Sequence, residues 1–313
     1  MGTPDFAVAS LKAVLDAGYH VVAVITAPDK PAGRGKKLNR SAVKKYAVEN
    51  GLKVLQPLRL KNPEFLEELK TLKADLQVVV AFRMLPEQVW DMPPMGTINL
   101  HASLLPQYRG AAPIHNAIIN GEKETGLTTF LLQKEIDTGN ILLRKKLKIG
   151  PEETAGELHD RMMIAGGQLL VETIERLFKG DIKPINQQQL IQPGTVLKPA
   201  PKIFKEDCRI RWNNDPDTVH NFIRGLSPYP CAFSELNSPK GEALVVKIFK
   251  ASREKSSSQF HPGTILTDGK NHIKVAVVDG FIRLHELQLA GKKRLQTGEL
   301  LRGFALDNGW HFT

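Results

Sequence analysis

The sequence has 313 residues, of which 42% are hydrophobic and 24% are charged. This composition is that of an ordinary globular protein and excludes an intrinsically disordered chain. The length exceeds the usual size of one compact domain, so two domains are expected. The net charge of +10 gives a positive field that favours polyanionic partners, but charge alone does not choose among RNA, DNA and anionic metabolites.

Cys208 and Cys231 form no Cys-x-x-Cys pair and have no nearby histidine at zinc-ligand spacing. They indicate neither a disulfide framework nor a metal site, and they fit a reducing compartment. The longest apolar runs, residues 21–25 and 78–82, are far shorter than the roughly 20 residues of a membrane helix. The first six residues lack the features of a signal peptide, so we expect a cytoplasmic protein with no metal and no membrane partner.

Strand-like apolar runs alternate with stretches of helical periodicity in the first half of the chain. The expected strands are residues 21–26, 54–56, 76–81 and 97–100. This alternation predicts an α/β domain with a Rossmann-like, doubly wound sheet of parallel strands joined by helices. Such sheets bind ligands beyond the carboxyl ends of their strands, so the residues after Val80 and Ile98 lie where the site is expected.

The pattern then changes twice along the chain. Residues 128–133 and 141–148 predict paired strands, and residues 157–178 predict a long amphipathic helix. A Gln- and Pro-rich stretch at residues 181–201 has no periodicity and is expected to be a linker. The expected division is therefore a catalytic domain at residues 1–180, the linker, and a second domain at residues 202–313.

The second domain is expected to contain five short strands separated by Gly and Pro turns. They lie near residues 232–236, 243–251, 263–266, 273–278 and 281–289. This pattern predicts a small β-barrel, for which an OB-like fold is the leading candidate because such barrels often bind nucleic acid.

Asn99 and His101 lie at the carboxyl end of one expected strand. Since side chains alternate along a strand, both project from the same face and can reach a common atom. Asp137, in the motif Ile136-Asp137-Thr138-Gly139, completes a candidate acid–base set. An amide donor, an imidazole and a carboxylate suit a reaction that passes through a tetrahedral oxyanion while a nitrogen loses a proton. The sequence does not show that Asp137 approaches His101.

Several motifs occur together in the order typical of one family. They are residues 2–6, 28–37, Asn99-x-His101, residues 103–114 and 137–139, followed by residues 209–212 and 290–293. This order resembles, across essentially the whole chain, the methionyl-tRNA formyltransferases, a family of folate-dependent enzymes. The Asn, His and Asp set marks the reaction class, whereas the basic loop at residues 33–37 and the second domain mark the tRNA enzymes.

The resemblance implies a transfer of the formyl group of 10-formyltetrahydrofolate to the α-amino group of initiator methionyl-tRNA. The product would be N-formylmethionyl-tRNA for translation initiation. By the resemblance, Asn99 donates a hydrogen bond to the formyl oxygen, His101 stabilises the charge developing there, and Asp137 assists proton removal from the amine. The residues implied in the folate pocket are Phe82, Arg83, Met84, Leu85, Ser103, Leu104, Leu105, Pro106 and Gly110.

The resemblance also implies a tRNA-binding surface. The enzyme is expected to be a monomer. Taken alone, the Gly- and Pro-rich loop at residues 28–38 is more often a solvated basic turn. The family pattern instead implies that this loop neutralises acceptor-stem phosphates and that Arg34 reaches into the stem where the first base pair is unpaired. The residues implied in tRNA binding are Arg34, Lys36, Lys37, Lys202, Arg209, Arg211, Lys292 and Lys293.

Relatives in the family carry a short apolar strand immediately before the position of Gly2, whereas this sequence begins at Met1. The first strand of a doubly wound sheet is central, and its neighbours need backbone partners. We therefore expect either a start further upstream or another way of filling the gap.

Two other functions would use part of the same features. A formyltransferase acting on a nucleotide sugar or a glycinamide nucleotide would share Asn99, His101 and Asp137, but the basic loop and the barrel argue against it. A non-catalytic RNA-binding protein would use the barrel and the basic side chains, but the presence of all three site residues argues against that function.

Overall fold

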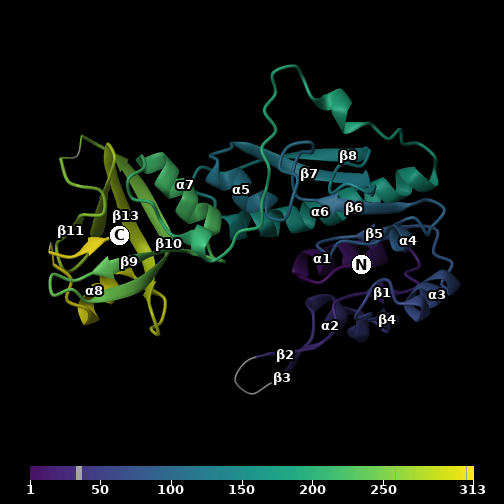
Figure 1. Ribbon diagram of the computed structural model, residues 1–313, viewed down its shortest axis with the longest axis horizontal. Helices are drawn as coiled ribbons and strands as arrows, with labels where there is room; N and C mark the ends of the chain where they lie inside the picture. Colours follow the sequence, from purple (N-terminus) through teal and green to yellow (C-terminus); the bar gives the residue numbers. More distant parts are fainter. Residues whose placement is uncertain (33–36, 258, 308) are drawn as a thin grey trace. The chain divides into compact units, whose positions relative to one another are not determined.

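The computed structural model describes residues 1–32, 37–257, 259–307 and 309–313. The chain forms two compact units (Figure 1). The first consists of Met1–Gly110, Gly126–Leu147 and His159–Pro199, and the second of Ala111–Thr125, Lys148–Leu158 and Ala200–Thr313. Two short segments from the first half of the chain thus belong to the second unit.

The first unit is built on two short parallel strand pairs and an antiparallel extension. Strand β1 (Val24–Ile25) pairs with β4 (Val54–Leu55), and β5 (Gln77–Val79) pairs with β6 (Thr97–His101), which pairs antiparallel with β7 (Glu124–Leu131) and leads to β8 (Ile141–Lys148). The other elements are α1 (Asp5–Asp16), the β2–β3 hairpin (Lys30–Ala32, Lys37–Asn39), α2 (Ala42–Glu49), α3 (Pro63–Thr71), α4 (Glu87–Trp90) and most of α6 (Ala155–Phe178). Helices join the parallel strands, which confirms the predicted α/β class.

The helices of the first unit cover the sheet through their apolar positions. Phe65 and Leu69, one turn apart on α3, are buried against Ile25, Leu55 and Val79 of the strands. The side chain of Asn62 caps the amino end of α3 by accepting a hydrogen bond from the Glu64 nitrogen. This packing holds α3 against β1, β4 and β5.

Met1 and Gly2 occupy the position between β1 and β5. The Met1 nitrogen donates to the Val78 oxygen, the Val80 nitrogen donates to the Met1 oxygen at 2.9 Å, and the Gly2 nitrogen donates to the Ile25 oxygen at 3.1 Å. Only a glycine fits at position 2, because an added Cβ would lie 2.4 Å from the Ala7 Cβ.

A cavity of about 300 Å³ lies next to these two residues, and its apolar lining includes Leu11, Val14, Val22, Val78 and Ile174. Strands β1 and β5 are shorter than the strands expected at residues 21–26 and 76–81.

The second unit is an antiparallel barrel that is almost closed. Its strands are β9 (Ala232–Asn237), β10 (Ala243–Lys255), β11 (Ile265–Thr267), β12 (Ile273–Val277), β13 (Gly280–Leu289), β14 (Leu295–Gln296) and β15 (His311–Phe312), in the order β11-β12-β13-β10-β9-β15 with β14 beside β13. Helices α5 (Pro113–Ile119), α7 (Pro216–Leu226) and α8 (Thr297–Gly303) accompany them. A bridge between Thr264, just before β11, and His311 of β15 joins the two ends of this strand order. This near closure confirms the predicted OB-like barrel.

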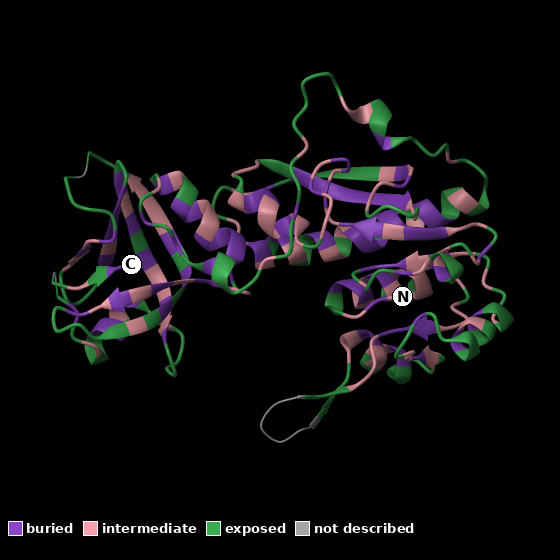
Figure 2. Ribbon diagram, in the orientation of Figure 1, coloured by how far each residue is buried: buried purple, intermediate pink, exposed green. Residues whose placement is uncertain are grey.

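The barrel closes where a glycine allows two backbones to meet. The Phe312 nitrogen donates to the Gly263 oxygen at 2.9 Å, and a Cβ on Gly263 would lie 2.2 Å from the Phe312 oxygen. Alternate residues of β9 are buried, and the core contains Trp212, Ile248 and Leu284. Figure 2 colours the buried stretches of the barrel strands purple. Among the described residues, no helix combines the length and apolar character needed to cross a membrane.

Helix α7 holds a buried histidine between an acidic and a basic side chain. His220 is 1% exposed, its Nε2 lies 2.9 Å from Glu152 Oε2, and its Nδ1 lies 2.7 Å from Arg253 Nη1. A guanidinium can only donate, so Nδ1 accepts and the proton of a neutral imidazole faces Glu152. Burial, helped by the charges of Arg253 and Arg224 and opposed by Glu152, lowers the pKa of His220 below its ordinary value.

We expect the free energy of unfolding to fall as the pH is lowered through about 6.5, the ordinary histidine pKa. Below that pH the unfolded chain takes up a proton that the folded His220, with its lowered pKa, still refuses. Denaturant titrations at pH 8 and pH 5.5 should show a smaller loss in His220→Gln than in the original protein. The exposed His261→Gln serves as the control, and an equal loss in all three proteins would exclude His220 as the source.

Candidate active site

Strand β6 carries Asn99 and His101 into the middle of the sheet. Asn99 is aligned with Val79 of β5 on one side and with Phe130 of β7 on the other, and His101 is aligned with Thr128. His101 is 7% exposed, and its Nε2 lies 2.9 Å from the Tyr108 oxygen. A carbonyl oxygen only accepts, so Nε2 donates to this backbone oxygen and Nδ1 is the other ring nitrogen.

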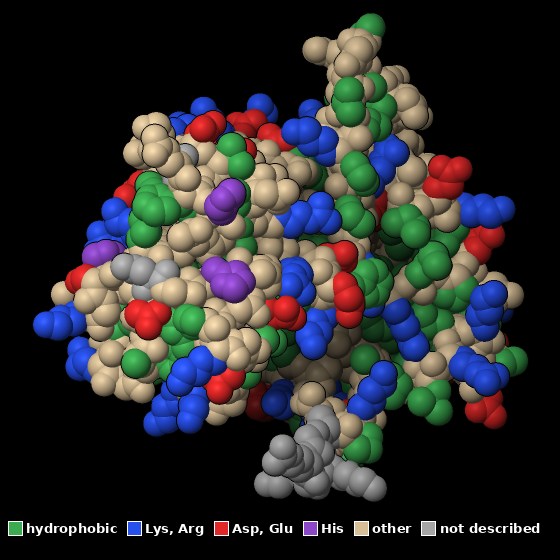
Figure 3. Space-filling model, turned by 60° about the vertical axis from the view of Figure 1, so that its left-hand side comes forward, with side chains coloured by type: hydrophobic (Ala, Val, Ile, Leu, Met, Phe, Trp, Pro, Cys, Tyr) green, Lys and Arg blue, Asp and Glu red, His purple; other side chains and the backbone are tan. Residues whose placement is uncertain are grey.

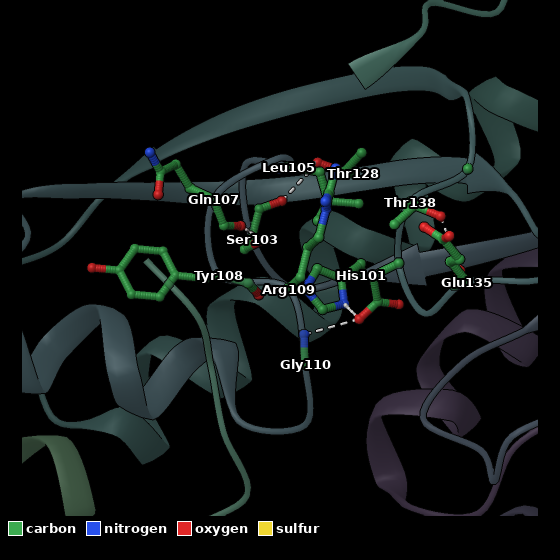
Figure 4. A network of polar contacts seen from close by, with 12 residues as sticks. His101, Ser103, Leu105, Gln107, Tyr108, Arg109, Gly110, Thr128, Glu135 and Thr138 are labelled. Atoms are coloured by element: carbon green, nitrogen blue, oxygen red, sulfur yellow. Dashed lines mark hydrogen bonds and ion pairs between the residues drawn. The ribbon is translucent and has the colours of Figure 1, made fainter. Parts of the chain in front are cut away.

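Asp137 lies in the loop between β7 and β8, and its carboxylate comes close to that nitrogen. The distance from Asp137 Oδ2 to His101 Nδ1 is 3.8 Å, and the same oxygen accepts a hydrogen bond of 2.9 Å from the Gly110 nitrogen. In Figure 4 the dashed lines from Gly110 and His101 meet at this oxygen. The structure thus brings together two residues whose proximity the sequence left open.

The Asp137 loop has a tightly constrained backbone. Asp137 has a φ of 54°, in the left-handed region that few residues other than glycine adopt. A Cβ on Gly139 would lie 1.7 Å from the Leu131 oxygen, so the loop is pressed against β7. Thr138 Oγ1 donates to the Glu135 oxygen at 3.1 Å. Strain of this kind persists only where neighbouring contacts hold it, and it is concentrated at functional sites.

The segment after β6 is folded back on itself beside the site. Ser103 Oγ donates to the Gln107 oxygen at 2.6 Å, and Thr128 Oγ1 donates to the Ser103 oxygen at 2.7 Å (Figure 4). Of the pocket residues expected here, Ser103, Leu105 and Pro106 are buried, whereas Leu104 and Gly110 are half-buried. Leu105 packs in a small apolar cluster with Phe130 and Ile141.

The other expected pocket segment follows β5, on the neighbouring strand. Phe82 is half-buried, Leu85 is buried, and Arg83 and Met84 are exposed. The Arg83 guanidinium donates to the Leu58 oxygen at 3.0 Å and lies 5.6 Å from the centre of the Phe82 ring. Arg83 is therefore partly engaged in fixing this loop.

The residues expected to bind tRNA fall into three groups: residues outside the described ones, residues with a partner in the structure, and exposed residues. Arg34 and Lys36 lie outside the described residues, as does the side chain of Lys37. Arg209 pairs with Glu235 at 3.0 Å, and the Lys202 Nζ lies 5.2 Å from the centre of the Phe204 ring. Arg211, Lys292 and Lys293 are exposed. Lysine and arginine side chains are spread over the face in Figure 3, with acidic side chains between them.

Two side chains next to the site, Gln187 and Arg109, were not among the predicted site residues. Gln187 Nε2 donates to the backbone carbonyl oxygen of Asp137 at 2.9 Å, and Gln187 Oε1 accepts from Arg109 Nη2 at 2.6 Å. Gln187 belongs to a run of three glutamines in the stretch expected to be a linker, and nothing in the sequence separates it from Gln188 and Gln189. Within the described part of the chain, no group of three or more His, Cys, Asp or Glu side chains could hold a metal ion.

The models of two protein families match this chain, one in each half. The model of the formyl transferase family matches residues 1–174, and the model of the formyl transferase C-terminal domain matches residues 202–305. The chain belongs to the formyl transferase family. The enzyme class that the Asn, His and Asp motifs predicted is thereby confirmed.

Relatives within the formyl transferase family extend over almost the whole chain. A protein named methionyl-tRNA formyltransferase from Bacteroides thetaiotaomicron is 57% identical over 99% of this chain and 96% of its own length. Another of that name from Porphyromonas gingivalis is 52% identical over 98% of this chain and 95% of its own length.

Solved structures share the fold at much lower identity. WlaRD, a sugar 3N-formyl transferase, has a TM-score of 0.62 at 20% identity and covers 93% of this chain and 97% of its own. An N-formyltransferase from Helicobacter canadensis has a TM-score of 0.62 at 20% identity and covers 94% of this chain and 97% of its own.

Proposed function

We propose that this enzyme transfers the formyl group of 10-formyltetrahydrofolate to the α-amino group of initiator methionyl-tRNA. The observation that carries the proposal is the extent of the similarity to proteins named methionyl-tRNA formyltransferase, 57% identity over 99% of the chain. It includes the barrel unit as well as the unit that holds Asn99, His101 and Asp137. Catalysis is assigned to residues 1–180 and tRNA binding to residues 202–313, with residues 181–201 between them.

The site chemistry supports an acyl transfer to an amine. As the amine nitrogen bonds to the formyl carbon, the carbonyl oxygen becomes an oxyanion, which the Asn99 amide is suited to stabilise as a hydrogen-bond donor. The amine must lose one proton, and the leaving folate nitrogen must gain one when its bond to the formyl carbon breaks. Asp137 is the acceptor assigned to the first proton, and the protonated carboxyl group can return it to the leaving folate nitrogen.

His101 is assigned a charge-stabilising role that acts through Nδ1. Its other nitrogen, Nε2, donates a hydrogen bond of 2.9 Å to the backbone carbonyl oxygen of Tyr108, and this bond holds the ring in one orientation. A proton on Nδ1 then lies on the side of the ring that faces Asp137 Oδ2, 3.8 Å away. We assign this side of the ring to stabilising the developing oxyanion, beside the carboxylate assigned as the base.

The remaining residues of the folate pocket are assigned from the two loops that follow β5 and β6. These are Phe82, Arg83, Met84 and Leu85 from the first loop, and Ser103, Leu104, Leu105, Pro106 and Gly110 from the second. Both loops follow the carboxyl ends of parallel strands, which is where open α/β sheets bind their ligands. The reaction is assigned to the cytoplasm, with the enzyme acting as a monomer.

The direct test is incubation of the pure protein with 10-formyltetrahydrofolate labelled in the formyl group. The acceptors are charged initiator tRNA, charged elongator tRNA and an amino-sugar nucleotide. Label should appear on initiator methionyl-tRNA. Label on the amino-sugar nucleotide alone would overturn the proposed substrate and leave the reaction class intact.

Arg34 is expected to select the tRNA, a prediction that rests on the sequence because this residue lies outside the described ones. Arg34→Ala should lower kcat/KM for initiator methionyl-tRNA about tenfold or more, while Lys36→Ala lowers it less. A contact made after the acceptor end opens favours the tRNA whose end opens easily, whereas a phosphate contact holds any tRNA. Arg34→Lys should not fully restore activity, because an ammonium lacks the planar fork of a guanidinium.

Kinetics on initiator tRNA and on a variant with its first acceptor pair restored to Watson–Crick would separate the two roles. The KM for the folate should be nearly unchanged in both protein variants. If Arg34→Ala and Lys36→Ala lower activity equally on both tRNAs, the loop acts as an electrostatic tether and selection lies elsewhere.

A further inference from the structure

Gln187 is a buried polar side chain in the segment that the sequence assigns to a linker. It begins the short 3-10 helix η1 (Gln187–Leu190) and is 1% exposed, whereas its neighbours Gln188 and Gln189 are exposed. Burying an amide costs free energy unless both its N–H groups and its oxygen are hydrogen-bonded. The partners of Gln187 therefore indicate what its burial achieves.

The Gln187 amide uses all of its hydrogen-bonding capacity. Nε2 donates to the Asp137 oxygen at 2.9 Å and to the Gly139 oxygen at 2.8 Å. Oε1 accepts from Arg109 Nε at 3.1 Å and from Arg109 Nη2 at 2.6 Å. Carbonyl groups only accept and a guanidinium only donates, so chemistry fixes the orientation of the amide. A flipped amide would set oxygen against two oxygens.

The two donated bonds hold the loop whose conformation is unusual. Asp137 has a φ of 54°, and Gly139 leaves no room for a side chain against Leu131. Asp137 presents its carbonyl oxygen to Gln187 and its carboxylate to Gly110 and His101. Gln187 is therefore hydrogen-bonded to the backbone of Asp137, whose side chain is assigned the proposed proton transfer.

The segment around Gln187 is itself anchored on both sides. The nitrogens and oxygens of Ile185 and Ile141 form two reciprocal hydrogen bonds of 2.8 Å, which tie the segment to the start of β8. On the other side of Gln187, Leu190 packs against the apolar cluster of Leu105, Phe130 and Ile141. The amide is thus a fixed support for the loop.

We propose that Gln187 is a positioning residue, which holds the Asp137 carboxylate in place for formyl transfer. This inference rests on the proposed function for its kinetic consequences. An alternative role for the same amide is to hold the Arg109 guanidinium, and the choice of substitution separates the two roles.

Gln187→Glu and Gln187→Met differ in which contacts they keep. Glutamate has nearly the same shape and keeps an acceptor for Arg109, but it loses both donated bonds and sets an oxygen against the oxygens of Asp137 and Gly139. Methionine loses every hydrogen bond. If Gln187 positions Asp137, both variants should lower kcat roughly 10- to 100-fold with little change in the folate KM, since a small misplacement of a catalytic group has effects of this size.

The exposed Gln189→Met is the matched control, and its kcat should stay unchanged. Near-normal kcat in Gln187→Glu together with a low kcat in Gln187→Met would assign the role to Arg109 and overturn the proposal. Equal kcat in all three variants would overturn it as well.

A double substitution tests whether Gln187 acts through Asp137. In an Asp137→Asn background, Gln187→Met should lower kcat little further, because the group that it positions no longer functions. A further loss as large as that in the original protein would show a general structural effect and exclude a positioning role.

Hydrogen exchange at the Gly110 amide gives a readout that needs no substrate. This amide donates to Asp137 Oδ2 at 2.9 Å, so it reports where the carboxylate lies. Its exchange should be faster in Gln187→Glu and Gln187→Met than in Gln189→Met. Unchanged exchange in all variants would overturn the positioning role even if activity fell. If the original protein formylated no acceptor, the proposed function would fail while the exchange result still decided the role of Gln187.

Discussion

Asp137→Asn, His101→Ala and Asn99→Ala are each expected to lower the turnover of formyl transfer by about two orders of magnitude or more. Asparagine at position 137 keeps the shape of the side chain but cannot accept a proton from the amine. Removal of the His101 ring takes away the nitrogen that faces Asp137 Oδ2 at 3.8 Å, and removal of the Asn99 amide takes away the oxyanion donor. Losses of this size arise because the three groups act in one transition state.

Single-turnover kinetics with saturating folate and initiator methionyl-tRNA would measure this effect without the step of product release. The exposed Asp181→Asn is a matched control for Asp137→Asn and should keep its turnover. Melting temperatures close to that of the original protein would show that folding is intact. Near-normal turnover in one of the three variants would remove that residue from the mechanism.

Gly139→Ala is expected to lower kcat at least tenfold, because a Cβ at this position would lie 1.7 Å from the Leu131 oxygen. The contact is with backbone, so the loop rather than a flexible side chain must move, and Asp137 would move with it. A displacement of this order misplaces the base relative to the amine. The melting temperature should fall as well, because Gly139 also accepts a hydrogen bond from Gln187 at 2.8 Å.

Gly303→Ala is the control for this substitution, since an added Cβ there meets open space at the end of α8. Its kcat and melting temperature should be those of the original protein. If Gly139→Ala had the same kcat as Gly303→Ala, the tight approach of the Asp137 loop to β7 would be unimportant for catalysis.

Features that depend on local patterns were predictable from the sequence. Alternating apolar runs and helical periodicity predicted the α/β unit, and short strands between Gly and Pro turns predicted the barrel. Both predictions were possible because apolar residues recur at one fixed spacing in helices and at another in strands. The pairing of Asn99 and His101 was predictable for the same reason, since residues two apart on a strand share a face. The ordered motifs then identified the family.

Features that depend on residues far apart in the chain became visible only in the folded molecule. The approach of Asp137 to His101 requires the loop after β7 to fold back over the end of β6, and no local period encodes that path. Of the three successive glutamines at positions 187–189, the fold buries only Gln187, because η1 directs its amide at the backbone oxygens of Asp137 and Gly139 and at the Arg109 guanidinium. Hydrogen bonds of this kind are satisfied in three dimensions, so only the folded chain reveals which side chain makes them.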